Sequence, residues 1–409
     1  MPLAFSVPFP ATYAPMLAPV RAPEQFTHPD APVGSALRGS RPSGWRRVRR
    51  VALFAAALCL FAALVSYVKM LTERSDSSLG IRTVEWMRDN GARGIVNEVE
   101  SIYYSFNAPS TGGPALRALP KQTGAVGAGA ARYHVHYYRP RRIEPTIHPA
   151  LPGEGVWRAT FAPGRSHPPV LITSFRPDPS YPQLVAGVAW IDHTQTSVWL
   201  YPGLSEPAVT LPSRGPMEVP IRRRRQLVAT FNSGFKLSDS GGGFAIGGHT
   251  YAPMQPDVAT IVRYRNGKVN VISWTGGPSA GADVAYARQN LPLIVNHGRP
   301  NPNLSDGPEW GATLGNAIRV WRSAVGVDRH GNLIYAAAPI QSVGSLAAIM
   351  VRAGAVRAME LDINTYWTSF ITYRLPGAGD PADLLPSMDR SPDRYLTPDD
   401  RDFFAVYVR

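Results

Sequence analysis

The sequence predicts an α+β protein: a β-rich domain with few helices, preceded by one transmembrane helix and a helical juxtamembrane segment. Residues 51–68 contain no charged residue, and this apolar run approaches the roughly 20 residues that a helix needs to cross a bilayer. From residue 151 onward, short β-type runs alternate with Pro and Gly. In that region residues 342–354 carry the clearest helical periodicity.

These patterns divide the chain into four parts. Residues 1–45 are rich in Pro, Ala and Ser, a composition typical of a disordered tail. Residues 46–70 form the membrane anchor, and residues 71–150 hold juxtamembrane helices and a Gly-, Ala- and Pro-rich flexible linker. Residues 151–409 form the β-rich domain, which is long enough for a single core.

The charges around the apolar run predict its orientation. Arginines cluster at residues 46–50 before the run, whereas residues 69–76 after it carry little net charge. By the positive-inside bias, the N-terminus is cytoplasmic and the β-rich domain is extracytoplasmic. A cleaved signal peptide is the alternative, but the preceding tail is long and no A-x-A site follows. A buried core helix is disfavoured by the flanking arginines. We therefore expect a single-pass protein of the cell membrane.

Composition excludes several classes of partner and site. The formal charge is +13. Two further arginine clusters, at 139–142 and 222–225, could meet a phosphate-rich polymer, but no nucleic-acid motif accompanies them, so we expect no nucleic-acid partner. The single cysteine, Cys59, excludes an internal disulfide and a cysteine-based metal site. Nothing in the sequence implies an obligate protein partner.

Residues 320–370 give the clearest local signals. Ala324–Asp328 and Leu333–Ala337 are apolar runs on either side of turn residues, which predicts a hairpin. Ser342 or Ser345 can cap the helix that follows, and Gly354 is suited to end it.

The next strand, Ala355–Leu361, ends in Asp362-Ile-Asn364. This aspartate either faces an open edge, where chemistry is common, or caps a turn. Both alternatives are open at this point.

Other segments carry weaker signals. Gly247-Gly248 and Asn266-Gly267 predict two-residue hairpin turns. Residues 79–107 have helical periodicity broken at Asp89-Asn90-Gly91. His134 and His136 alternate on one strand face, and without a third ligand nearby we favour a structural role.

Polar residues at the ends of several predicted strands are candidate site residues. Glu360 and Asp362 share one face of their strand. Each of these signals is weak alone, and no G-x-S-x-G elbow, P-loop or H-E-x-x-H motif is present. The set comprises Asn232, Lys236, Gln289, Asn290, His297, Arg322, Glu360, Asp362 and Asn364.

Taken in order, three motifs between residues 185 and 370 resemble the phosphodiester glycosidase family. They are FNSGF, WRSAVGVDRHGNLIYAAA and SVGSLAAIMVRAGAVRAMELD. The chain departs from the family at one point: the usual Leu-Asp-Gly-Gly-Gly-Ser is here Leu361-Asp-Ile-Asn-Thr-Tyr. The Asp is retained, whereas Ile363 and Tyr366 would shape the neighbouring site differently.

The resemblance implies a phosphodiester-glycosidase-like fold and hydrolysis of sugar-1-phosphodiesters at the glycosidic C1–O bond, here in cell-envelope glycans. It implies catalytic roles for Asp362, for Glu360 as second carboxylate and for His297 as acid. Arg322 would hold the phosphate. The remaining residues would contact substrate: Asn232, Asn364, Gln289, Asn290 and Lys236.

No cofactor is certain from the resemblance. Asp362 is also a candidate ligand for a divalent metal. The alternative function is a non-catalytic glycan-binding or envelope-assembly protein that keeps the fold.

Overall fold

A computed structural model describes residues 43–92, 94–96, 111–126, 138–160, 167–311 and 317–409. Nearly all of the expected tail at 1–45, both His134 and His136, and parts of the expected linker and juxtamembrane helices lie outside these residues. The chain divides into two compact units, Met1–Phe61 and Ala62–Arg409.

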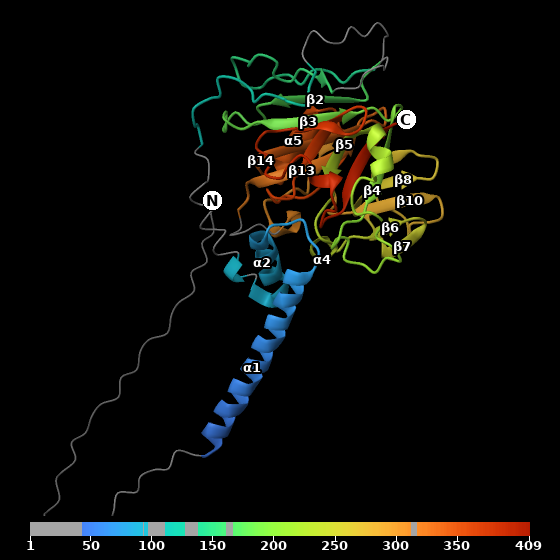
Figure 1. The fold of residues 1–409 in the computed structure, drawn as a ribbon. Coiled ribbons are helices and arrows are strands. Elements are labelled where there is room, and N and C mark those ends of the chain that lie inside the picture. Colours follow the sequence, from blue (N-terminus) through green and yellow to red (C-terminus); the bar gives the residue numbers. More distant parts are fainter. Residues whose placement is uncertain (1–42, 93, 97–110, 127–137, 161–166, 312–316) are drawn as a thin grey trace, which may run out of the picture. The chain divides into compact units, whose positions relative to one another are not determined.

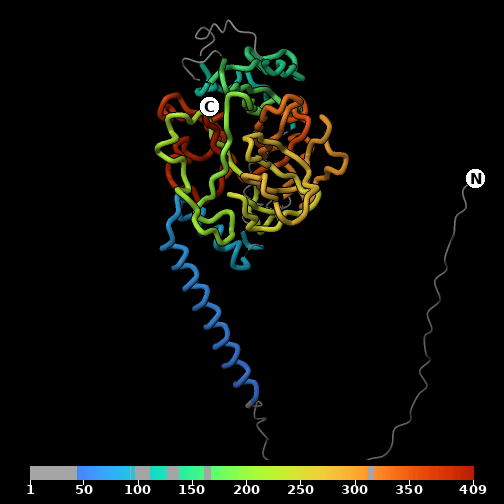
Figure 2. The backbone as a smooth tube through the Cα atoms, turned by 90° about the vertical axis from the view of Figure 1, so that its right-hand side faces the viewer, coloured from blue at the N-terminus to red at the C-terminus, as the bar shows by residue number. Residues whose placement is uncertain are grey.

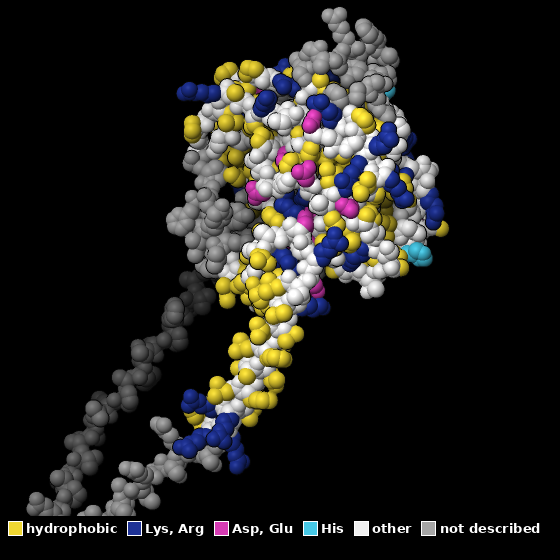
Figure 3. All heavy atoms as spheres, viewed as in Figure 1, with side chains coloured by type: hydrophobic (Ala, Val, Ile, Leu, Met, Phe, Trp, Pro, Cys, Tyr) yellow, Lys and Arg dark blue, Asp and Glu magenta, His cyan; other side chains and the backbone are white. Residues whose placement is uncertain are grey.

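A long apolar helix, α1 (Ser43–Thr72), is present where the membrane anchor is expected. Within it, Gly44–Thr72 is long and apolar enough to cross a membrane. Figure 3 shows Lys and Arg side chains at the start of α1 and hydrophobic side chains along it. Apolar residues such as Phe54 and Phe61 are exposed along the helix. The helix is longer than the apolar run because the flanking arginines and Lys69 are also good helix formers.

The juxtamembrane segment contains α2 (Leu79–Met87), which is followed by a π-helical turn, η1 (Arg88–Ala92). Ser78 caps α2, since its side chain accepts a hydrogen bond from the backbone N–H of Ile81. The predicted break at Asp89-Asn90-Gly91 falls within η1, where Gly91 has a φ of 87°. Residues 94–96 are helical again.

The rest of the molecule is β-rich, as expected, with three antiparallel sheets among the described residues. The first has eight strands in the order β1 (Arg158–Ala159), β2 (Val170–Phe175), β3 (Ala186–Ile191), β14 (Leu333–Gln341), β13 (Val320–Val327), β15 (Arg357–Glu360), β11 (Leu293–Asn296) and β12 (Arg299–Pro300). The second has five: β7 (His249–Ala252), β6 (Phe244–Ile246), β10 (Val284–Gln289), β8 (Ala259–Tyr264) and β9 (Val269–Ser273). The third also has five: β17 (Gly379–Asp383), β16 (Phe370–Arg374), β5 (Leu227–Asn232), β18 (Phe403–Val408) and β4 (Thr196–Tyr201).

Helices are few in this region, as predicted. Among the described residues they are α4 (Leu237–Ser240) and α5 (Val343–Arg352), with 3-10 turns η2 (Ile221–Gln226), η3 (Pro308–Trp310) and η5 (Arg394–Leu396). In Figure 2 the strands of the second sheet, in yellow to orange, lie on one side of the body, and the C-terminal strands, in red, lie on the other.

The core explains why the sheets pack together. One cluster of buried side chains takes residues from all three sheets. At its centre Phe231 of β5 stacks on Phe370 of β16 and on Phe404 of β18. A second cluster lies between the eight-stranded sheet and α5, whose Leu346 and Met350 are fully buried. Figure 1 shows α5 beside β14 and β13.

The predicted unit at residues 320–370 is confirmed in detail. β13 and β14 pair antiparallel, and Asp328 closes their turn by accepting hydrogen bonds from the N–H groups of His330 and Asn332. Ser342 caps α5, and Gly354 follows the helix with a φ of 95°. β15 then ends at Glu360, so Asp362 lies two residues beyond a buried strand.

The two predicted hairpins differ in length. Gly247 and Gly248 form the whole connection between β6 and β7, both with positive φ, as expected for a two-residue turn. Asn266-Gly267 lies inside a longer connection, residues 265–268, between β8 and β9. The connection is longer because its ends bond to each other: the backbone N–H of Tyr264 donates to the Lys268 carbonyl. The N–H of Lys268 donates to the Asn266 side chain inside the turn.

Candidate active site

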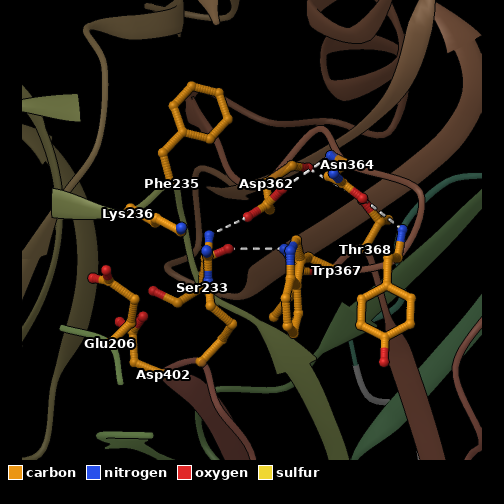
Figure 4. A network of polar contacts seen from close by, with 12 residues as sticks. Glu206, Ser233, Phe235, Lys236, Asp362, Asn364, Trp367, Thr368 and Asp402 are labelled. Atoms are coloured by element: carbon orange, nitrogen blue, oxygen red, sulfur yellow. Dashed lines mark hydrogen bonds and ion pairs between the residues drawn. The ribbon is translucent and has the colours of Figure 1, made fainter. Parts of the chain in front are cut away.

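Asp362 opens onto a cavity of about 1190 Å³. The end of α1, the juxtamembrane segment and loops at strand ends of the β-rich body all contribute to the lining of this cavity. Three of the predicted residues, Lys236, Asp362 and Asn364, contribute to the lining. Figure 4 shows these three with Glu206 and Trp367, which also line the cavity.

Asp362 is held by backbone and by one cation. Its main chain bonds to neighbouring strand ends, since its N–H donates to the Ser233 carbonyl and its carbonyl accepts from Ser323. One carboxylate oxygen accepts from the Asn364 N–H at 2.9 Å, and the other accepts from the Arg401 guanidinium at 2.7 Å. Burial raises the pKa of Asp362, and Arg401 offsets this effect in part. The site thus holds a carboxylate whose proton affinity is increased.

Arg401 is a site residue that the sequence argument missed. It belongs to the run Asp399-Asp-Arg-Asp402 just before β18, and all four residues are buried. Four consecutive charges before an apolar strand were a usable signal, because charged residues are rarely buried without a partner. Asp362 is the partner of Arg401.

The other charged residues that line the cavity include Lys236 and Glu206. Lys236 forms ion pairs with Glu85 and Asp89 of the juxtamembrane segment. Burial lowers the pKa of Lys236, but the Glu85 carboxylate outweighs burial and raises it, so Lys236 remains a cation. Glu206, also missed from sequence, is buried, and burial raises its pKa while Arg401 opposes the shift. The cavity therefore contains the cations Arg401 and Lys236 together with two carboxyl groups of raised pKa, those of Asp362 and Glu206.

Asn364 and the aromatic residues after it form the turn that follows Asp362. The Asn364 side chain accepts a hydrogen bond from the Tyr366 N–H, and its carbonyl accepts from the N–H groups of Trp367 and Thr368. The Trp367 ring lies 5.0 Å from the Arg401 guanidinium carbon. This turn replaces the glycines of the family motif with side chains.

Three of the predicted amides do not line the cavity and instead bond within the fold. Asn232 donates to the Ser233 carbonyl and to Ser323, and accepts from Tyr335 and the Ser369 N–H. Gln289 bonds to Gly243, Gln255 and Thr260. Asn290 bridges the Phe235 N–H and the Glu360 carbonyl.

Arg322 and Glu360 also lie outside the cavity lining, in a buried ion pair at 2.5 Å. The guanidinium of Arg322 also donates to the carbonyls of Gln341 and Trp310. Burial raises the pKa of Glu360 to about 7 against the opposing effect of Arg322. One oxygen of Glu360 has no hydrogen-bond partner among the described residues.

His297 lies in the turn between β11 and β12, where it is exposed with a φ of 50°. It does not line the cavity that contains Asp362.

The described residues offer no ligand set for a metal. Within them, no three or more His, Cys, Asp or Glu side chains are grouped so that they could hold an ion. At Asp362 itself, one oxygen is bonded to Arg401 and the other to a backbone N–H.

A family model matches part of this chain. Residues 225–362 match the family model of the phosphodiester glycosidases, so the match ends at Asp362. No curated protein matches the chain.

Solved structures show distant likeness. The catalytic domain of zebrafish N-acetylglucosamine-1-phosphodiester alpha-N-acetylglucosaminidase, auto-inhibited by its pro-peptide, is 15% identical with a TM-score of 0.38, covering 61% of this chain and 86% of that one. A hypothetical protein from Synechocystis is 16% identical with a TM-score of 0.35, covering 59% and 62%. The match to the family model at residues 225–362 agrees with the resemblance of the motifs to the phosphodiester glycosidase family, from which this chain is divergent.

Proposed function

We propose that this protein is a membrane-anchored, outward-facing hydrolase that cleaves the glycosidic C1–O bond of sugar-1-phosphodiesters in cell-envelope glycans. The observation that carries the proposal is Asp362: it closes the family match, lines the cavity and has a raised pKa. The anchor rests on α1, and the orientation rests on the arginines before it.

In the proposed reaction a water oxygen bonds to C1 of the sugar while the bond from C1 to the bridging phosphate oxygen breaks. The products are the free sugar and a phosphate monoester. A carboxylate beside C1 stabilises the oxocarbenium-like transition state and can accept the proton from water. Asp362 supplies this group.

Arg401 and Lys236 supply the positive charge that a phosphate leaving group needs. Glu206 is the second carboxyl group. With its raised pKa it can donate a proton to the leaving oxygen where one is required.

The test is turnover by the purified full chain in detergent micelles. Sugar-1-phosphodiesters are incubated with the protein, with a divalent metal and separately with a chelator, and the free reducing sugar is measured. The reaction is run in water labelled with heavy oxygen. Release of sugar together with an unlabelled phosphate monoester supports the proposal, whereas a labelled monoester would place the cut at the P–O bond, and release of sugar phosphate would place it on the other side of the phosphate; either result contradicts the proposal.

A second candidate function is glycan binding without catalysis. The observation that favours it is the replacement of the Gly-Gly-Gly-Ser turn by Ile-Asn-Thr-Tyr after Asp362, because Ile363 and Asn364 occupy the cavity wall where glycines would admit a substrate. Binding of the same phosphodiesters at equilibrium without any turnover would select this alternative.

A further inference from the structure

Part of the wall of the Asp362 cavity is formed by the predicted membrane helix itself. Ser66, Lys69 and Met70 of α1 line it together with Asp362 and Arg401. These three helix residues are spaced i, i+3, i+4 and so share one face of α1. The apolar run ends at Val68, so Ser66 lies in its last turn and Lys69 and Met70 follow directly after it. The cavity wall therefore includes the end of the apolar run.

The chain length limits how far the cavity can be from the bilayer. Arg74, which also lines the cavity, follows Val68 by six residues. Six residues span about 9 Å as helix and about 20 Å fully extended. Each interfacial layer of a bilayer is about 5–8 Å thick. The nearer rim of the cavity therefore lies at the height of the lipid headgroups when α1 crosses the membrane.

Aromatic side chains support the same placement. Tyr67 and Trp86 contact each other edge to face at 5.0 Å, and the Trp86 indole donates to Ser66. Both residues belong to types that concentrate at membrane–water interfaces, where one end of the ring is apolar and the other is wet. This pair also joins α2 to the end of α1, so the cavity wall and the helix end form one structure.

The rim carries cations suited to a lipid phosphate. Arg74 is exposed, and in the part of the chain that the structure describes Lys69 pairs only with Glu73, at 3.8 Å and with both side chains exposed. An exposed ion pair at that distance contributes little free energy, so both cations can bind an anionic headgroup instead. Met70 and Ile81 supply apolar surface beside them.

We infer that the sugar-1-phosphodiester cleaved at this site is carried by a membrane lipid, with the lipid alcohol on the far side of the phosphate. This inference rests on the proposed function and names its substrate class. Water adds to C1, the bond from C1 to the phosphate oxygen breaks, and the lipid retains a phosphate monoester. The phosphate lies at headgroup height, and the sugar reaches Asp362.

The experiment uses the full chain in phosphatidylcholine vesicles and two substrates with the same sugar-1-phosphate. In one the phosphate is esterified to a long-chain alcohol embedded in the vesicle, and in the other to methanol. We expect kcat/KM for the lipid-borne substrate to be at least tenfold higher, the effect of about 1.4 kcal/mol of extra binding. Equal values, or cleavage of the methyl ester alone, overturn the inference and leave the proposed function standing. If neither substrate is cleaved, the proposed function fails with it.

The lipid-borne substrate could be cleaved faster because it contacts the cavity wall or only because the vesicle concentrates it near the protein. Two variants distinguish these causes. Met70→Asn changes a residue that lines the cavity, whereas Leu71→Asn changes its exposed neighbour, which does not. We expect Met70→Asn to lower the ratio of lipid-borne to soluble kcat/KM by about tenfold, because a Met side chain contributes at least that much when buried. Leu71→Asn should leave the ratio unchanged. An unchanged ratio in Met70→Asn, or an equal fall in both variants, overturns the inference.

Discussion

Asp362 is the residue on which the proposed chemistry depends. Replacing it by Asn keeps the shape and the bond from the Asn364 N–H but removes the charge. We expect turnover to fall by about 10²–10³, as when one preorganised electrostatic group is removed. The free energy of unfolding should also fall, by about 1–3 kcal/mol, because Arg401 loses a buried partner. Turnover and thermal unfolding are measured on the same preparation.

Asp328→Asn is the matched control for this variant. Asp328 is also buried and hydrogen-bonded, but it closes the β13–β14 turn and does not line the Asp362 cavity. It should lower stability while turnover per folded molecule stays normal. If Asp362→Asn behaves in the same way, Asp362 is a structural residue and the hydrolase proposal loses its central group.

Asn232 illustrates a residue whose contacts are internal. Its side chain serves four groups inside the fold, from Ser233, Ser323, Tyr335 and Ser369. Asn232→Ala leaves several buried polar groups without partners, so the free energy of unfolding should fall by about 2–3 kcal/mol. Asn364→Ala, at a half-buried position, should have a smaller effect. Denaturant titrations of both variants measure this, and a larger loss for Asn364 would contradict the assignment.

At the scale of elements, local signals predicted local structure. The hairpin of β13 and β14, the Ser342 cap and the Gly354 stop each depend on residues close in sequence, and all three are confirmed. Sheet pairing depends on residues far apart. β5 pairs with β18, placing Asn232 opposite Phe403, and no local pattern encodes that register.

The same distinction explains what the sequence could say of the site. An amide at a strand end gives one signal for two roles, since substrate contact and an internal hydrogen bond need the same side chain. Only the distant neighbours decide, and for Asn232, Gln289 and Asn290 those neighbours lie within the fold. Arg401 lies beyond the conspicuous motifs, and only the fold brings it to Asp362.

Residues Ser75–Ser77, here called the strap, bond to the β-rich body, and we predict that this docking depends on pH. Ser75 and Ser77 donate to the Asp400 carboxylate, and Asp76 pairs with Arg390. Burial first, and then Asp399, raise the pKa of Asp76 from 3.8 to about 7. The docked strap therefore binds a proton more tightly than a released one. Its docking is strongest below about pH 4 and weakens as pH rises toward 7.

Hydrogen exchange of residues 75–78, corrected for intrinsic rates, measures this docking. Protection should decrease between pH 5 and pH 7.5 in the parent protein. In Asp76→Asn the protection should no longer depend on pH across that range. Constant protection in the parent would show that Asp76 is ionised when docked, contrary to its raised pKa.

At the scale of the whole molecule, the juxtamembrane segment and the β-rich body form one unit, Ala62–Arg409. Among the described residues, the polar contacts that join them include those of the strap with Asp400 and Arg390 and the pairs of Glu85 and Asp89 with Lys236. Since both places border the Asp362 cavity, the orientation of α1 decides which side of the membrane the chemistry serves.

The final prediction is that α1 crosses once, with the tail in the cytoplasm and the β-rich body outside. Four arginines, at positions 46, 47, 49 and 50, precede the apolar run, whereas the formal charges of Lys69, Glu73, Arg74 and Asp76 after it cancel. Because positive charge resists translocation, the arginine-rich end should remain inside. Protease added to intact cells should digest the body and spare an epitope placed on the tail. Replacing the four arginines by Gln should remove this preference, so that part of the tail becomes accessible. Digestion of the tail alone in the parent protein would reverse the topology and exclude an outward-facing site.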